Sequence, residues 1–205
     1  MLKLEKKRPK EVDQILQIPI EKYNIMQQRD GMHLTDGIYC LRKAYWNKVD
    51  PLPPTTEEIL YFLFGLGLQD ALLGGDNQSV AEHEGILVSP DYWENGVLGE
   101  LKTTRMGEKR INEVGIPDGW RRQMMGYAYV LGVDRALLVL LTIIKPDVLS
   151  YVLHFEDDEL KQNWEWIADR VGALRYALDS GTVPPPDADW QCKNCRYGLR
   201  CKAGG

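Results

Sequence analysis

The pattern of apolar and polar positions predicts a chain in which helices and strands alternate. A nearly continuous apolar run over Ala136–Lys145 indicates a buried central strand. Pro146-Asp147 then predicts a turn into a second strand over Val148–Phe155. A long helix is expected from near Asp157 to Ser180, because its apolar residues recur at helical spacing: Trp164, Ile167, Val171, Leu174 and Leu178.

Three further helices are expected in the first third of the chain. A weak helical pattern covers Val12–Ile18, and Thr35 is expected to cap a short helix that carries Cys40, Leu41, Ala44 and Tyr45. The prolines at positions 51, 53 and 54 predict a linker. The third helix follows Thr56, runs to about Leu73 and ends at Gly74-Gly75.

A β-hairpin is the clearest short-range feature. Two strand-like runs, Val80–Trp93 and Val97–Thr103, flank Asn95-Gly96, and Asn-Gly is favoured where both turn residues need positive φ. A helix is expected next, from about Trp120 to Leu131, stopped by Gly132. The pattern as a whole predicts an α/β fold, a small mixed sheet with helices on its faces.

Length and composition are those of an ordinary globular domain. The chain has 205 residues, of which 44% are apolar and 27% charged, so one domain with a real core is expected. No run approaches the ~18 apolar residues of a membrane span. The first residues, Met-Leu-Lys-Leu-Glu-Lys-Lys-Arg, do not resemble a signal peptide. We therefore expect a cytoplasmic protein without a membrane partner, in which cysteines are metal ligands rather than disulfides.

Basic residues gather locally although the formal net charge is −5. One cluster lies between Glu100 and Arg122 and contains Lys102, Arg105, Lys109, Arg110, Arg121 and Arg122. The other, in the last fourteen residues, contains Lys193, Arg196, Arg200 and Lys202 and no acid. Phosphate contacts need a basic patch rather than a basic total. Charge alone does not separate a nucleic-acid groove from solvated surface.

The hairpin also carries the candidate chemistry. With Asn95-Gly96 as a two-residue turn, the predicted pairs are Glu94 with Val97, Trp93 with Leu98, Tyr92 with Gly99, and Asp91 with Glu100. Lys102 shares the face of Glu100, because side chains alternate along a strand. Two adjacent carboxylates suit a hard cation such as Mg²⁺ or Mn²⁺, and the lysine could orient a water. The alternative is a surface strand with ordinary alternating charges.

Two polar residues on the following helix extend this constellation. Gln123 and Tyr127 are four residues apart, so they share a helical face. They could contact a nucleic-acid backbone or the lysine of the hairpin. On their own they are more typical of a half-buried helix with two ordinary polar residues.

The four cysteines fall into two groups. Cys192, Cys195 and Cys201 are spaced as C-x2-C-x5-C, whereas Cys40 lies far upstream. Together they would close a four-coordinate site that ties the two ends of the chain. Zinc and an iron–sulfur cluster fit this spacing equally well. Two disulfides, or four unrelated thiols, are weaker alternatives.

In combination these pieces resemble the CRISPR-associated iron–sulfur exonucleases, with their phage relatives, within the RecB-like branch of the PD-(D/E)XK nuclease superfamily. The resemblance runs from about His33 to Cys201. It rests on these pieces in order: His33-Leu-Thr-Asp, Cys40-Leu-Arg-Lys-Ala-Tyr45, the Gly65–Leu72 helix, Pro90-Asp91, Glu100-Leu101-Lys102, Gln123-x3-Tyr127 and the terminal cysteines.

The resemblance assigns roles to particular residues. It implies that Asp91, Glu100 and the carbonyl of Leu101 bind Mg²⁺ or Mn²⁺, that Lys102 is the catalytic lysine, and that Gln123 and Tyr127 form an accessory motif. It also implies that Cys40, Cys192, Cys195 and Cys201 hold a structural [4Fe–4S] cluster. One departure is that Gln69 stands where the family has a metal-binding histidine. His83 is a weaker substitute for it.

The resulting expectation is a metal-dependent exonuclease that acts on single-stranded DNA ends. Its setting would be CRISPR spacer acquisition, with adaptation integrase proteins as partners, DNA repair or recombination, or phage DNA processing. Arg105, Lys109, Arg121 and Arg122 are expected to contact DNA. The alternative is an adaptor that keeps the fold and cluster without turnover. We expect a single nuclease domain over 1–205, with its core at about 55–180 and a cluster lobe formed by 31–50 and 187–205.

Overall fold

A four-stranded mixed sheet forms the centre of the computed structural model, which describes residues 10–22, 29–74, 81–187 and 190–203. Its strands are β4 (Tyr92–Glu94), β5 (Val97–Thr104), β6 (Arg135–Thr142) and β7 (Asp147–His154), side by side in that order. The β5 and β6 strands pair in parallel, and the outer pairs are antiparallel. The predicted central position of the apolar β6 strand is confirmed.

Three of the four predicted pairs of the β4–β5 hairpin are confirmed, whereas the fourth, Asp91 with Glu100, is not part of the ladder, because β4 begins at Tyr92. Tyr92 pairs with Gly99, Trp93 with Leu98 and Glu94 with Val97. Asn95 and Gly96 form the turn at φ 52° and 75°, the positive values that select Asn-Gly. Asp91 instead reaches β5 through its side chain, which accepts the backbone N–H of Leu101.

A second, smaller sheet was not predicted. It consists of β1 (Met32–His33), β2 (Ala81–His83) and β3 (Ile86–Val88), in the order β1-β3-β2. The run predicted as one strand over Val80–Trp93 is wrong, because Glu84 and Gly85 turn the chain at φ 51° and 71°. Val80, the start of that prediction, lies outside the described residues.

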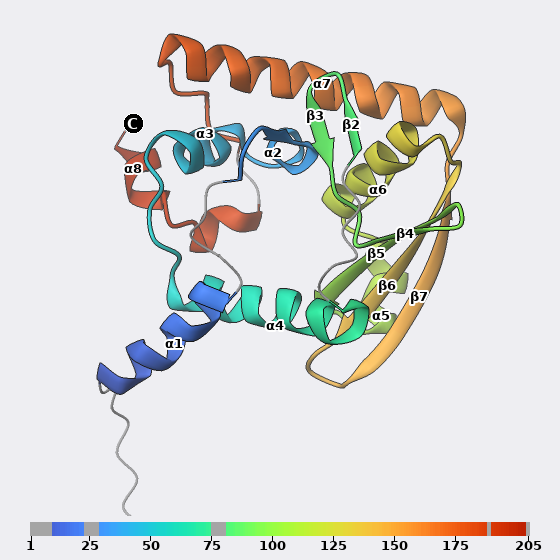
Figure 1. Cartoon of the computed structure of the whole chain (residues 1–205), viewed down its shortest axis with the longest axis horizontal. Helices are drawn as coiled ribbons and strands as arrows, with labels where there is room; N and C mark the ends of the chain where they lie inside the picture. The colour runs from blue at the N-terminus through green and yellow to red at the C-terminus, as the bar shows by residue number, and fades with distance from the viewer. Residues whose placement is uncertain (1–9, 23–28, 75–80, 188–189, 204–205) are drawn as a thin grey trace, which may run out of the picture.

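A pair of long helices packs together over one side of the sheets (Figure 1). The longest, α7 (Asp157–Ser180), ends at Gly181 as predicted and packs on α6 (Asp118–Leu131), which ends at Gly132. Between these helices and the sheet lies the main core, whose fully buried residues include Leu138, Leu140 and Ile167. The helical periodicity of α7 is thus explained by burial of one stripe.

The predicted helix around Cys40 is in fact two helices. The first, α2 (Leu34–Ile38), follows His33, and the second, α3 (Leu41–Val49), follows Cys40. Thr35 therefore lies inside a helix rather than capping one. The backbone breaks at Tyr39, which is extended at φ −95° and ψ −165°. The side chains of α2 belong to the main core, although α2 precedes the boundary predicted at residue 55.

Two other helix predictions need correction. Thr55, not Thr56, caps α4 (Thr56–Leu73), and it exchanges hydrogen bonds with Glu58 in a capping box. Gly74 ends α4 in the left-handed conformation, as predicted, whereas Gly75 lies outside the described residues. A short helix, α5 (Glu108–Val114), was not predicted.

The C-terminal segment folds back onto the first third of the chain. It contains a 3₁₀ turn, η1 (Trp190–Asn194), and α8 (Gly198–Lys202). Between them, buried Tyr197 donates a hydrogen bond to Asn47 and accepts one from the amide of Leu52. In Figure 1 this segment lies beside α3 and α4. The amphipathic pattern near residue 12 becomes α1 (Lys10–Lys22), which contacts α4.

Within the described residues, every helix is too short or too polar to cross a membrane.

Replacing Gly37 with Ala should destabilise the protein by about 1–3 kcal/mol, as overpacking does. Gly37 faces α7, where an added Cβ would lie 2.8 Å from Val171 Cγ2 and 3.1 Å from the backbone oxygen of Ile167. Backbone at the centre of α7 cannot move away easily. Chemical denaturation of the two proteins measures the difference.

Gly172→Ala is the matched control. It lies in the interior of α7 and a Cβ there meets nothing within 4 Å, so it should stabilise by about 0.5–1 kcal/mol. Equal effects of the two substitutions would show that α2 and α7 do not pack as closely as described.

Candidate active site

Polar side chains from three parts of the fold meet beside β5. The β4–β5 hairpin supplies Asp91, Glu100 and Lys102, α4 supplies Gln69, and α6 supplies Gln123 and Tyr127. The structure thus brings together the residues that the sequence placed in one site.

Glu100 is the centre of this group and is almost fully buried, with its side chain 3% exposed. Its Oε1 accepts hydrogen bonds from Lys102 Nζ at 2.5 Å and from Gln123 Nε2 at 2.9 Å. Gln123 also accepts from Lys102 at 3.0 Å and donates to the Tyr127 hydroxyl at 2.8 Å. The i, i+4 pair on α6 therefore extends the hydrogen bonding of the hairpin lysine.

Asp91 is held from the other side. It lies just before β4, and its Oδ2 accepts the backbone N–H of Leu101 at 2.8 Å. Its Oδ1 accepts from Gln69 Nε2 at 2.9 Å. Gln69 therefore points at Asp91, as expected if it stands where the resembling family has its histidine. Rotation of the amide by 180° would place Oε1 where the nitrogen lies.

Burial disfavours the ionised forms of the acidic groups in this cluster. Burial, and secondarily the charge of Asp91, raises the pKa of Glu100 to about 7, although Lys102 opposes the shift. Burial also raises the pKa of Asp91. The pKa of Lys102 is raised because Glu100 outweighs the opposing effect of burial. Burial and then the charge of Glu100 raise the pKa of Tyr127 well above its usual value.

The second oxygen of Glu100 is the feature that fits a cation. Oε2 is buried and accepts no hydrogen bond from the described residues. A buried carboxylate oxygen without a partner is costly, and a divalent ion would satisfy it. Asp91 and the Gln69 amide meet beside the backbone of Leu101, one residue from Glu100, and carboxylate and amide oxygens are of the kind that Mg²⁺ and Mn²⁺ prefer.

The described residues contain no group of three or more His, Cys, Asp and Glu placed to share one metal ion. The oxygen set above includes only two carboxylates, so it does not contradict that finding. His83, the weaker candidate ligand, instead makes edge contacts with the rings of Tyr129 and Trp164.

The four basic residues expected to contact DNA have different surroundings. Arg105 is exposed just after β5, and Lys109 on α5 is 92% exposed, with Glu113 at 3.9 Å. Arg121 and Arg122 both bind the carboxylate of Asp118. Arg122 turns further toward α7, where it donates to Asn163.

The cysteines lie in the corner where the C-terminal segment meets α3. All four are free thiols: Cys40 precedes α3, Cys192 lies in η1, Cys195 follows it and Cys201 lies in α8. Burial raises the pKa of Cys195, and the neighbouring Cys40 and Cys192 raise it further. Arg42 on α3 approaches Cys201 Sγ at 3.6 Å. The segments converge, but the thiols are not grouped closely enough to share a metal ion in this arrangement.

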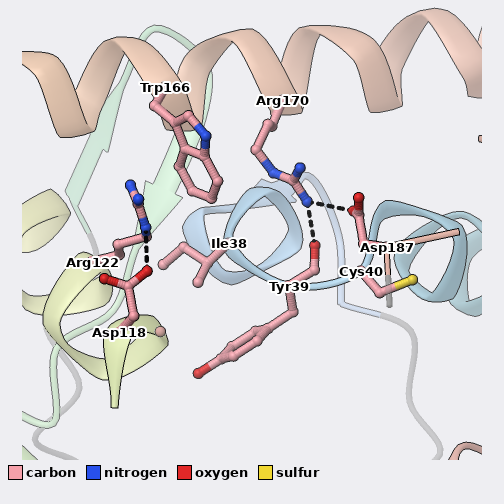
Figure 2. Close-up of a pocket in the computed structure, with 9 residues that line it drawn as sticks. Ile38, Tyr39, Cys40, Asp118, Arg122, Trp166, Arg170 and Asp187 are labelled. Carbon is pink, nitrogen blue, oxygen red and sulfur yellow. Dashed lines mark hydrogen bonds and ion pairs between the residues drawn. The ribbon is translucent and has the colours of Figure 1, made fainter. Parts of the chain in front are cut away.

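Arg170 on α7 is a structural residue that the sequence did not indicate. It donates to the backbone oxygens of Gly37 and Tyr39 and to Asp187 Oδ2 at 2.7 Å (Figure 2). Asp187 in turn accepts the amide of Leu41. These bonds fix the break between α2 and α3. An arginine within an amphipathic helix carries no sequence signal for such a role.

Tyr39 and Arg29 were also missed. The Tyr39 side chain contributes to the raised pKa of Lys102, and Arg29 opposes the raised pKa of Tyr127. Both precede the hairpin by more than fifty positions, so spacing could not connect them with it.

Comparison with known proteins gives likeness of structure only. No protein-family model matches the chain, and no curated protein matches its sequence. The crystal structure of SSO0001 superposes with a TM-score of 0.61 at 18% identity, covering 94% of this chain and 96% of that one.

LHK-Exo in complex with dAMP superposes with a TM-score of 0.50 at 11% identity, covering 73% of this chain and 90% of that one. A second structure of LHK-Exo, an alkaline exonuclease from Laribacter hongkongensis, gives 0.47 at 10% identity with the same coverage. The chain therefore shares its fold with SSO0001 and, more distantly, with LHK-Exo.

Proposed function

We propose that the protein is a metal-dependent exonuclease that acts on single-stranded DNA ends. The observation that carries the proposal is the buried, unpartnered Oε2 of Glu100 in a cluster with Asp91 and Lys102. A buried glutamate and a half-buried aspartate beside a lysine are suited to binding a cation and to hydrolysing a phosphodiester. The fold that the chain shares with LHK-Exo is consistent with this activity.

The cation would be held by Asp91, Glu100, the carbonyl of Leu101 and the amide oxygen of Gln69. When bound, Mg²⁺ or Mn²⁺ polarises a phosphoryl oxygen and lowers the pKa of a coordinated water. Asp91 keeps its orientation through the Leu101 amide, which leaves it pre-positioned for this role.

Lys102 would act directly on the reacting phosphate. Glu100 keeps it protonated, and Glu100 and Gln123 together fix the direction of Nζ. A fixed ammonium can orient the attacking water and stabilise the charge that grows on phosphorus. The Tyr127 hydroxyl accepts a hydrogen bond from Gln123 and so acts as a positioning group for that amide.

Arg105, Lys109, Arg121 and Arg122 would bind the DNA backbone. The biological setting that we propose is trimming of DNA in CRISPR spacer acquisition, with adaptation integrase proteins as partners, or end processing in DNA repair, recombination or phage replication. We place the protein in the cytoplasm.

An adaptor function is the second candidate. The observation that favours it is Gln69, whose neutral amide replaces a metal-binding histidine and donates to Asp91. Such a protein would bind DNA without cleaving it.

We further propose that Cys40, Cys192, Cys195 and Cys201 ligate a [4Fe–4S] cluster, with structural zinc as the alternative. The support is convergence of the segments that carry them, tied by Arg42 to Pro184 and by Lys43 to Gln191. Binding of the cluster would require the four thiols to lie closer together than they do in this structure. The proposed role of the cluster is structural, and no step of the reaction is assigned to it.

Asp91→Ala and Glu100→Ala should each lower cleavage by about a hundredfold or more, because each removes a proposed metal ligand. Lys102→Ala should lower turnover by about 10²–10³-fold with a smaller effect on metal affinity. The measurement is Mn²⁺-dependent digestion of single-stranded DNA, with EDTA as the blank.

Glu94→Ala is the matched control for these substitutions. It removes an exposed carboxylate from the same hairpin, outside the cluster, and should leave cleavage unchanged. Full cleavage by Asp91→Ala or Glu100→Ala would remove that residue from the site. No cleavage by the wild type with either metal would favour the adaptor.

The affinity for the metal should decrease as the pH is lowered below about 7. Glu100 has a pKa of about 7 in the metal-free protein, so at lower pH the ion must displace a proton. The apparent affinity for Mn²⁺ should then drop about tenfold per pH unit below that value. Calorimetry in buffers of different protonation enthalpy counts the released proton.

In Glu100→Gln the residual affinity should lose this pH dependence, whereas Glu94→Gln should retain it. An affinity that is flat between about pH 6 and 8 in the wild type would contradict the assignment of Glu100 as a ligand.

Anaerobically purified protein should contain iron and sulfide and absorb broadly near ~400 nm. Cys195→Ala should lose both and unfold at lower denaturant concentration, because metal binding is coupled to folding. Elemental analysis decides the point, and one zinc without iron or sulfide would replace the cluster by a zinc site.

A further inference from the structure

A pocket of about 320 Å³ lies between α2, α6, α7 and the segment that precedes η1. Figure 2 shows its polar lining, which is Asp118 and Arg122 from α6, Arg170 from α7, and Asp187. The other lining residues are Trp166, Ile38, Tyr39, Gly119 and Cys40, the last of which is one of the proposed cluster ligands. The volume is at the lower end of the range for small-molecule sites, suited to a group the size of one nucleotide.

Two guanidinium groups dominate the pocket. The Cζ of Arg122 lies 4.0 Å from the centre of a Trp166 ring, and that of Arg170 lies 4.8 Å from it. In Figure 2 the indole stands between them. Cation–π contacts on the indole hold both charged groups in place.

Each guanidinium retains an unused donor. Arg122 uses Nε and Nη1, for Asp118 and Asn163, and Arg170 uses Nε and Nη2. Nη2 of Arg122 and Nη1 of Arg170 donate to no group in the described part of the chain. Arginine presents donors in a planar fork that matches phosphate oxygens.

Two carboxylates offset these charges in the absence of a ligand. The side chains of Asp118 and Asp187 are 61% and 41% exposed. Ion pairs this exposed contribute little stability, so a phosphate can replace the carboxylate on Arg122 at small cost. Asp118 would then reduce the affinity for an anion rather than increase it.

Tyr39 connects the pocket with the active site. Arg170 fixes its carbonyl, and its ring packs against Gly119 at the start of α6. Its side chain also acts electrostatically on Lys102. Tyr39 is thus both a wall of the pocket and a neighbour of the charge on Lys102.

We propose that this pocket binds one nucleotide unit of the single-stranded DNA, with its phosphate on Arg122 and Arg170. The inference rests on the proposed nuclease function and names a substrate subsite for it. Trp166 positions the two arginines, and Ile38 and Tyr39 form the apolar wall against which the sugar or base lies.

The test is equilibrium binding of a short labelled oligothymidylate by the full chain in EDTA, followed by anisotropy over a range of salt. Arg122→Gln should weaken binding about tenfold and reduce the salt slope by about one, since one phosphate contact is lost. Asp118→Asn should tighten binding about threefold or more, because the competing carboxylate is gone.

Matched controls carry the same charge changes outside the pocket. Arg175→Gln, also on α7, and Asp179→Asn, near its end, should change binding less than twofold under these screened conditions. Trp166→Ala should weaken binding without altering the salt slope, and Trp166→Phe should restore most of it. Asp118→Asn does not change apolar packing, so its effect on binding can still be measured if an arginine variant misfolds.

The subsite would be overturned if the pocket variants bound the oligothymidylate with the same affinity as their controls. It would also be overturned if the wild type did not bind the strand at low salt. Equal affinity for thymidine monophosphate would make the ligand a free nucleotide and would overturn the strand assignment. Because the assay excludes metal, altered binding in these variants supports the subsite even if the wild type never cleaves DNA. Cleavage with unaltered binding would reject the subsite alone.

Discussion

The candidate site depends on a carboxylate that the fold places where water cannot reach it. Glu100 is inside the protein, so its charge is tolerable only while Lys102 is beside it. One of its oxygens is used by Lys102 and Gln123, and the other is left without a partner. The local structure therefore surrounds a buried carboxylate oxygen that has no hydrogen-bond partner, and a bound divalent cation would stabilise it.

The hairpin was predictable because strand geometry has few free parameters. Asn95-Gly96 fixes the turn, the turn fixes the register, and alternation along β5 then places Glu100 and Lys102 on one face. The spacing of Gln123 and Tyr127 on α6 was predictable for the same reason, since helical periodicity is regular. Local rules were sufficient wherever the site is built from one continuous segment.

Other parts depended on contacts between distant segments. The turn at Glu84-Gly85 lacks a strong signal, so the small sheet was hidden within an apparently continuous strand. Arg170 gives no hint in the sequence that it binds the carbonyls of Gly37 and Tyr39. The pocket around Trp166 likewise arises only when α6 and α7 pack together. Tertiary contacts of this kind override local pattern and cannot be read from it.

The return of the C-terminal segment onto α3 affects the order in which the chain can acquire its structure. Tyr197 and its partner Asn47 are 150 positions apart, and the loop between them contains the whole central sheet. Closing so long a loop is slow compared with forming the β4–β5 hairpin. During synthesis on a ribosome, the sheet and α7 can therefore assemble first. The corner that holds the cysteines must wait until residues 190–203 have emerged.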